Sequence, residues 1–261
     1  MKRRYKYSII VIIPILCLIY VLYSLGFRFS PHEDDTIQNA VKHHNLSGLK
    51  NFISKTHDID IRDKNGKTAL QIASSVVFDH AIAEFLIQNG ADVNQVSVEG
   101  VPLITEILCS RKYREKEKML DLLVKYKADV NKKDIDGNTT IMSAIGEYWC
   151  EDIKHFMQYK PDVNVLNNKG ESALFIAVVN GSERNAVILL ENKANPNFIG
   201  SARHEKILFD PKNHQFCTTG KSLLDIATMM GEFGVVSVLK RHGAKTSEEL
   251  TAQKRHVMSK N

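Results

Sequence analysis

Three side chains that could bind a metal ion lie close together in the sequence. His204, His214 and Cys217 offer two imidazoles and a thiol, which are ligands that Zn²⁺ prefers in proteins. Their spacing as a group matches no structural zinc pattern. We therefore predict no metal site and no cofactor in this chain.

The other reactive residues form no catalytic arrangement. The ten histidines are scattered, and the sequence has no His-Glu-x-x-His pair, nucleophile elbow or phosphate-binding loop. The repeats contain three cysteines, Cys109, Cys150 and Cys217. An odd number of cysteines does not indicate a disulfide framework, because they cannot all pair. Cys109 and Cys150 could approach each other, although buried thiols are the favoured interpretation. We predict that the chain is not an enzyme, has no catalytic residues and takes no small-molecule substrate.

The elements that carry these residues are internal repeats. A glycine begins a similar segment at positions 66, 100, 137, 170 and 220, at spacings of 34, 37, 33 and 50 residues. In the fourth copy Ser172 predicts the N-cap of a helix over Leu174, Phe175, Ile176 and Ala177, which Gly181 ends. Residues 186–190 predict a second helix, and Asn197 closes the copy.

This order of turn, helix and helix with a period near 33 resembles the ankyrin repeat, over roughly residues 58–246. The resemblance implies an all-α ankyrin-repeat solenoid: about five helix-turn-helix repeats at 58–246 with β-turn fingers, and an insertion at 198–219. Residues 30–57 read as N-terminal capping helices, and 247–261 as a C-terminal tail. Lys127, Lys160 and Lys193 stand where glycine normally takes the left-handed conformation, at ~1 kcal/mol each.

An apolar run precedes the repeats. Residues 8–27 are about long enough to span a bilayer, so 1–29 predict a transmembrane signal anchor, or a cleaved signal peptide if the small residues near Gly26 are a cleavage site. Four basic residues precede the run and three acidic residues follow it. The positive-inside rule then places the N-terminus in the cytoplasm. We expect a single-pass protein of a bacterial inner membrane with periplasmic repeats, or a soluble periplasmic protein after cleavage.

The charge balance favours a protein partner. The chain carries a net charge of +5, and residues 1–29 hold five basic and no acidic residues, so the remainder has 30 of each sign. A neutral array lacks the electrostatic footprint of a nucleic-acid binder. We predict binding to protein and to the membrane, and not to nucleic acid.

Two segments are longer than the repeat requires. A charged run at 110–118 falls in the 37-residue copy and predicts a lengthened connection between two helices, or a solvated helix end. From Asn197 to Gly220 there are 23 residues where other copies have six, an excess of 17. Its apolar residues, among them Phe198, Phe209 and Phe216, either fold back on the array or anchor a partner.

The resemblance also implies where a partner binds, because ankyrin arrays bind proteins across the fingers and the inner helix face. The matching finger positions are Arg62, Lys64, Val96, Val98, Val101, Lys132, Lys133, Ile135, Asp136 and Leu166, together with Phe198, Phe209 and Phe216 of the insertion. The chain resembles exported bacterial ankyrin immunity proteins that occlude lipase-type toxin effectors of type VI secretion. The alternative is an envelope scaffold or adaptor for a resident membrane complex or for stress resistance.

Overall fold

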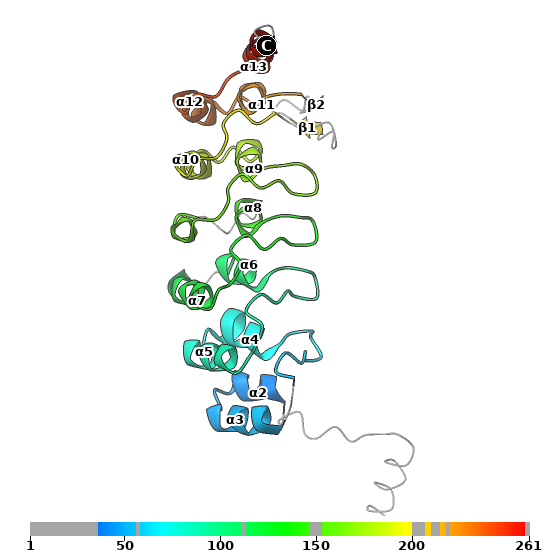
Figure 1. Ribbon diagram of the computed structural model, residues 1–261, viewed down its shortest axis with the longest axis vertical. Helices are drawn as coiled ribbons and strands as arrows, with labels where there is room; N and C mark the ends of the chain where they lie inside the picture. The colour runs from blue at the N-terminus through cyan, green and yellow to red at the C-terminus, as the bar shows by residue number, and fades with distance from the viewer. Residues whose placement is uncertain are drawn as a thin grey trace, which may run out of the picture.

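Helix pairs stack along one axis, with loops projecting to one side of the stack (Figure 1). The computed structural model describes residues 36–55, 58–110, 113–146, 153–199, 207–209, 215–217 and 220–258. The segment for which we predict a signal or membrane helix, residues 1–29, lies outside these residues. Within the described part of the chain, none of the helices has the length and apolar character needed to cross a bilayer.

Two short helices precede the first repeat. They are α2 (Ile37–Lys42) and α3 (Leu46–Lys55). Thr36 is the N-cap of α2, and its side chain accepts a hydrogen bond from the Asn39 N–H. Both helices turn apolar side chains toward the first repeat, where Ile37 and Leu49 are fully buried.

The fourth and fifth repeats are regular. The fourth consists of α9 (Ala173–Val179) and α10 (Glu183–Glu191), and the fifth of α11 (Leu223–Met230) and α12 (Phe233–Arg241). Ser172 caps α9 by accepting from the Phe175 N–H at 3.1 Å, which confirms the predicted cap. Ser222 caps α11 in the same way.

The first repeat holds one extra residue inside its first helix. This helix begins as α4 (Ala69–Gln71), continues as a π-helix, η2 (Ile72–Val77), and ends at Phe78 with a left-handed φ of 60°. The second helix is α5 (His80–Gln88). From the N-cap Thr68 to the N-cap Asp79 is a step of 11, against 10 from Ser172 to Ser182. Because a π-turn accommodates one additional residue, it explains the spacing of 34 rather than 33.

The second repeat is longer because its second helix is longer. It consists of α6 (Leu103–Leu108) and α7 (Tyr113–Lys125), and α7 has 13 residues where α5 and α10 have nine, a difference of four. Four residues are about one helical turn, and they account for the spacing of 37. Residues 113–118 of the charged run therefore form the start of α7.

The third repeat has a short second helix in its described part. Its first helix is α8 (Thr140–Gly146), followed by the 3₁₀ turn η3 (Phe156–Tyr159). Phe156 is fully buried and packs edge-to-face on Tyr159, with ring centroids 5.6 Å apart. Phe156 belongs to the buried core of the stack, and Tyr159 packs against that core.

The all-α prediction needs one correction, because the insertion contains a β-hairpin. Strands β1 (Ile207–Phe209) and β2 (Gln215–Cys217) pair antiparallel, with Leu208 opposite Phe216. The C-terminal tail is also ordered as a helix, α13 (Ser247–Met258), and no residue of α13 is buried. The backbone N–H of Ser247 donates to the Asp225 carboxylate of α11 at 2.9 Å, and the Ser247 hydroxyl donates to the same oxygen.

One apolar core runs the length of the stack, from Ile37 in α2 to Leu239 in α12. Lys127, Lys160 and Lys193 adopt φ values of 66°, 52° and 68°, so the predicted left-handed positions are confirmed. Each repeat buries its apolar face only against its neighbours, which is the arrangement of a solenoid.

Candidate protein-binding surface

A fixed side chain shapes each of the first four fingers, the loops that carry the turn glycines. Three residues before the glycine, one side-chain oxygen accepts two backbone N–H bonds across the turn. At the third finger, for example, Asp134 accepts from Asp136 at 2.9 Å and from Asn138 at 2.8 Å. These oxygens belong to Asp63, Ser97, Asp134 and Asn167. Because each turn is held from inside, the finger residues beyond it have fixed positions.

Successive repeats are also joined by a ladder of hydrogen bonds at the base of the fingers. The side chain that closes one repeat accepts from a backbone N–H of the next repeat, at 2.7 to 3.0 Å. The acceptors, in order along the stack, are Asp60, Asn94, Asn131, Asn164 and Asn197. Four rungs use an amide and the first uses a carboxylate. Burial raises the pKa of Asp60 above its ordinary value, against the hydrogen bond from Asp92 N–H, and the charges of Asp92 and Asp58 raise it further.

The tip of each of two fingers rests on the turn glycine of the preceding finger. A Cβ built on Gly66 would lie 2.4 Å from Val98 Cγ1, and one on Gly100 would lie 2.2 Å from Ile135 Cγ2. Both glycines also have positive φ, at 72° and 79°. Glycine is thus required at each turn by backbone conformation and by the close approach of the next tip.

These tips carry the most exposed aliphatic side chains among the predicted finger residues. Val98 is 63% exposed, Ile135 is 73% exposed and Leu166 is 43% exposed. Val96 and Val101, predicted alongside Val98, are half-buried in the finger. We name Val98 and Ile135 together the apolar tips, because they lie on adjacent fingers and each is supported by a glycine turn.

Some of the predicted charged finger residues bind other fingers of the array, and the others are exposed or half-exposed. Arg62 donates to Gly66 O and to Val96 O, both at 2.7 Å, so it ties the first finger to the second. Lys133 Nζ donates to Leu166 O at 3.0 Å, which ties the third finger to the fourth. Lys64 and Asp136 are exposed and Lys132 is half-exposed. The array therefore uses two of these five side chains to hold the fingers in register.

The insertion residues lie in different settings. Phe198 is half-buried and packs edge-to-face on the buried Phe175 of α9, with ring centroids 6.0 Å apart. For this residue the fold-back alternative is the one that the structure shows. Phe209 lies in β1 and Phe216 lies in β2. For these two residues the structure describes the backbone and not the side chains.

A groove runs between the fingers and the first helices of the second, third and fourth repeats. We call it the inner groove. It has a volume of about 700 Å³, its floor includes Glu106 of α6 and Ile176 of α9, and its wall includes Asp136 and Glu171 of the fingers. The four carboxylates that line it are those of Glu106, Asp134, Asp136 and Glu171, and the one lining lysine is Lys169.

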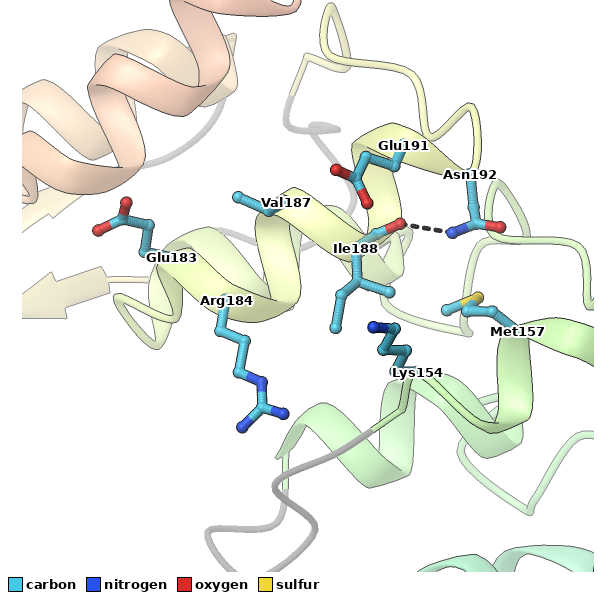
Figure 2. Close-up of a pocket in the computed structure, with 8 residues that line it drawn as sticks. All are labelled: Lys154, Met157, Glu183, Arg184, Val187, Ile188, Glu191 and Asn192. Atoms are coloured by element: carbon cyan, nitrogen blue, oxygen red, sulfur yellow. Dashed lines mark hydrogen bonds between the residues drawn. The ribbon is translucent and has the colours of Figure 1, made fainter.

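A second hollow lies on the opposite side of the helix pairs, beside α10 (Figure 2). It has a volume of about 730 Å³ and an apolar floor of Met157, Val187 and Ile188. Figure 2 shows Lys154 reaching from the neighbouring repeat toward Ile188, while Asn192 Nδ2 donates to the Ile188 carbonyl at 2.8 Å. Its two basic and two acidic side chains give no net charge, so this hollow favours neither a cationic nor an anionic ligand.

The residues considered for metal binding give no site within the described ranges. His204 and His214 lie outside them, and Cys217 contributes only its backbone to β2. Among the described residues, no group of three His, Cys, Asp or Glu side chains is placed to hold a metal ion. Cys109 is half-buried at the end of α6, and Cys150 lies outside the described part.

Comparisons with known proteins agree with this geometry. A family model for an ankyrin repeat matches residues 65–98, and one for three ankyrin repeats matches residues 107–199. Ankyrin repeat protein L91 of Acanthamoeba polyphaga mimivirus is 30% identical over 137 residues, which are 47% of this chain and 21% of that protein. The chain thus matches about a fifth of that relative's length.

Solved structures show the same fold at low sequence identity. An ankyrin repeat domain from Acinetobacter baumannii AYE is 24% identical and has a TM-score of 0.59, over 80% of this chain and 98% of that one. The ankyrin repeat domain of Bcl-3, a member of the IκB family, is 21% identical and has a TM-score of 0.63, over 82% and 89%. From its helix pairs, its fingers and these matches, the array of this chain is built of ankyrin repeats.

Proposed function

We propose that this chain is a protein-binding module whose apolar tips and inner groove face the partner, and that its N-terminal segment tethers it to a membrane. The observation that carries the proposal is the exposure of Val98 and Ile135 on two adjacent fingers. Aliphatic side chains with fixed positions can be buried by a partner at little cost in conformational entropy. The ladder, the finger turns and the glycine contacts supply that fixed position.

The finer form of the proposal concerns the partner. The chain resembles bacterial immunity proteins that bind secreted toxin effectors, so we propose that it neutralises a lipase-type effector by covering its active site. A tether of 1–29 would hold the array on the far side of an inner membrane, where such an effector acts. If the partner is instead a resident envelope protein, the chain is a scaffold or adaptor in the envelope.

Binding is tested by co-purifying the full-length chain with candidate effectors encoded beside its gene. Val98→Ser with Ile135→Ser removes both apolar tips and is expected to cost about 2 kcal/mol, or about thirtyfold in affinity. Phe233→Ser is the matched control, because Phe233 is 81% exposed at the start of α12, away from the fingers. Equal affinity for the tip variant, the control and the wild type would refute the assignment of this surface.

The tether is tested separately. Membrane fractionation with protease accessibility should find the repeats in the membrane fraction and on the periplasmic side. Deleting residues 1–29 should release them from that fraction. Repeats that remain in the cytoplasm would refute the tether and leave the binding surface intact.

A further inference from the structure

We propose that residues 30–35, the acidic segment just before α2, dock in a hollow between α2, α3 and the first finger, where they take the place of a preceding finger. We call this hollow the end hollow. Residues 30–35 themselves lie outside the described part of the chain. The inference goes beyond the proposed function, because it concerns a contact of the chain with itself and requires neither a partner nor a membrane.

The end hollow lies where the array begins, and it has a volume of about 490 Å³. Its lining comes from α2 with its N-cap Thr36, from Phe52 of α3, and from residues 61–64 of the first finger. The side chain of Gln38 in α2 donates to the Ile61 carbonyl of this finger at 2.6 Å. This hydrogen bond holds the two sides of the end hollow in a fixed relative position.

The helix α2 has the position of a first helix in a repeat. First helices of successive repeats pack on one another, and α2 packs in the same way on α4 and η2 at the start of the column (Figure 1). In the repeats a finger leads directly into the residue that caps the first helix. The tip residue Val98, for example, lies four residues before the N-cap Pro102. Since Thr36 is the N-cap of α2, residues 30–35 stand in the register of a finger.

The first finger has an uncovered neighbour position. Val98 rests on Gly66 and Ile135 rests on Gly100, so in both pairs a tip rests on the finger before it. In the ranges that the structure describes, no finger precedes the first one, in which Lys64 corresponds to Val98. The open end of a solenoid requires a capping element, because no further repeat covers it.

Charge complementarity identifies residues 30–35 as the occupant. The lining of the end hollow has three basic side chains and one acidic side chain, a net of +2, from Lys42, Arg62, Lys64 and Asp63. The segment has three acidic residues and no lysine or arginine, a net of −3, from Glu33, Asp34 and Asp35. Opposite charges on facing surfaces attract each other.

The connection to α2 favours this segment over an anion from another molecule. Thr36 lines the end hollow, and the three acidic residues directly precede it. Three residues of extended chain span at most ~10 Å, so these carboxylates start close to the basic side chains. A ligand that belongs to the same chain also has a high effective concentration.

A docked segment would fix the direction in which the chain leaves the array. It would also cover the side of the first finger that faces away from the other fingers. Lys64 would then contact the chain itself, and the partner would meet the array from the second finger onward.

Hydrogen exchange followed by mass spectrometry tests this contact on the full-length chain in a non-ionic detergent. The measured quantity is the exchange rate of the backbone amides of residues 32–35. The variants are Asp34→Lys in the segment, Lys64→Glu in the end hollow, and the two combined. Lys169→Glu is the matched control, because Lys169 is an exposed lysine in the turn of the fourth finger. Circular dichroism confirms that each variant is folded.

We expect these amides to exchange at least about tenfold more slowly in the wild type than in the unfolded chain. Each single reversal should speed exchange by about threefold to fivefold, because it removes one exposed ion pair. The combined variant should recover much of the loss, and Lys169→Glu should change nothing. High salt should also speed exchange in the wild type, because it screens exposed charges.

Two results would overturn the proposal. One is exchange of the wild-type segment at the rate of the unfolded chain. The other is slow exchange that is the same in Lys64→Glu and in the wild type, which would place the segment against a surface other than the end hollow. Neither result depends on whether a protein partner or a membrane tether is found.

Discussion

Asp60→Asn should stabilise the array at neutral pH, because it converts the one carboxylate rung of the ladder into an amide. Asp60 Oδ2 accepts the Asp92 N–H at 3.0 Å, and its Oδ1 is buried without a partner among the described residues. An asparagine oxygen would keep the first bond. Its amide nitrogen would gain a donor role, as Asn164 Nδ2 has toward the Lys193 carbonyl at 3.1 Å.

The expected gain is about 1 kcal/mol. An unsatisfied buried polar atom costs ~1 to 3 kcal/mol, and we take the low end because Asp60 is partly exposed and water screens its charge. In a domain of this size such a gain raises Tm by about 2 to 4 °C. The gain depends on pH. Since burial raises the pKa of Asp60 in the folded chain, the carboxylate costs nothing below its unfolded pKa and its full cost appears above its folded pKa.

Urea unfolding followed by circular dichroism, at pH 7 and again near pH 4, measures both parts. Asn94→Asp is the matched control: it places a carboxylate on the next rung, which accepts from Asp129 N–H at 2.7 Å, and should destabilise by a similar amount. A neutral or destabilising Asp60→Asn at pH 7, or a gain that does not shrink in acid, would refute the reasoning.

Three further predictions concern single sites. Lys160→Gly should stabilise by up to ~1 kcal/mol in urea unfolding, because it relieves a left-handed φ of 52°, and a loss would contradict this. Phe156→Ala should cost ~3 to 5 kcal/mol in thermal unfolding, because it empties a fully buried site; a cost below ~1 kcal/mol would show that the site collapses freely. Asp225→Asn should lower hydrogen-exchange protection in α13, because burial of Asp225 is outweighed by hydrogen bonds from Ser247 and Ser222 that keep its pKa below the ordinary value. In the wild type this protection should be present at neutral pH and fall as the pH drops through the folded pKa of Asp225, whereas pH-independent protection would contradict the link.

The repeat period was sufficient to predict most of the fold. Glycine spacing and the hydroxyl residues that follow four of the five glycines predicted the helix starts, and Ser172 caps α9 as expected. The same period predicted that Lys160 would be left-handed, because the position follows a helix end in every repeat. These features depend on local backbone chemistry, which a single sequence expresses directly.

Features that depend on packing were harder to predict. A spacing of 34 showed that one residue was extra, but only the structure shows that η2 absorbs it. The charged run before Met119 suggested a connection as well as a helix end, yet Lys116 is 4% exposed and its Nζ donates to the Leu108 carbonyl at 3.2 Å. Its aliphatic stem packs inside while its head group reaches a helix end. From the sequence alone, a lysine in a charged run is expected to be exposed to solvent.

The candidate surface was predicted as a group and resolved by the structure into individual residues. Val96, Val98 and Val101 were indistinguishable as apolar residues of one finger, and only Val98 is exposed. The residues of the inner groove could not be grouped from the sequence, because Glu106 and Asp136 lie on different repeats and are brought together by stacking. An acidic residue at a position that is aliphatic in three of the other four repeats was the one available clue.

The contact between each apolar tip and the preceding glycine has a consequence for how recognition can change over generations. Val98 packs against Gly66, and Ile135 packs against Gly100. A bulkier residue at either glycine would therefore displace the apolar tip of the next repeat. Duplication or loss of a single repeat would place an apolar tip against a different glycine turn. We expect partner preference in this lineage to drift through coupled substitutions in adjacent repeats more readily than through shuffling of whole units.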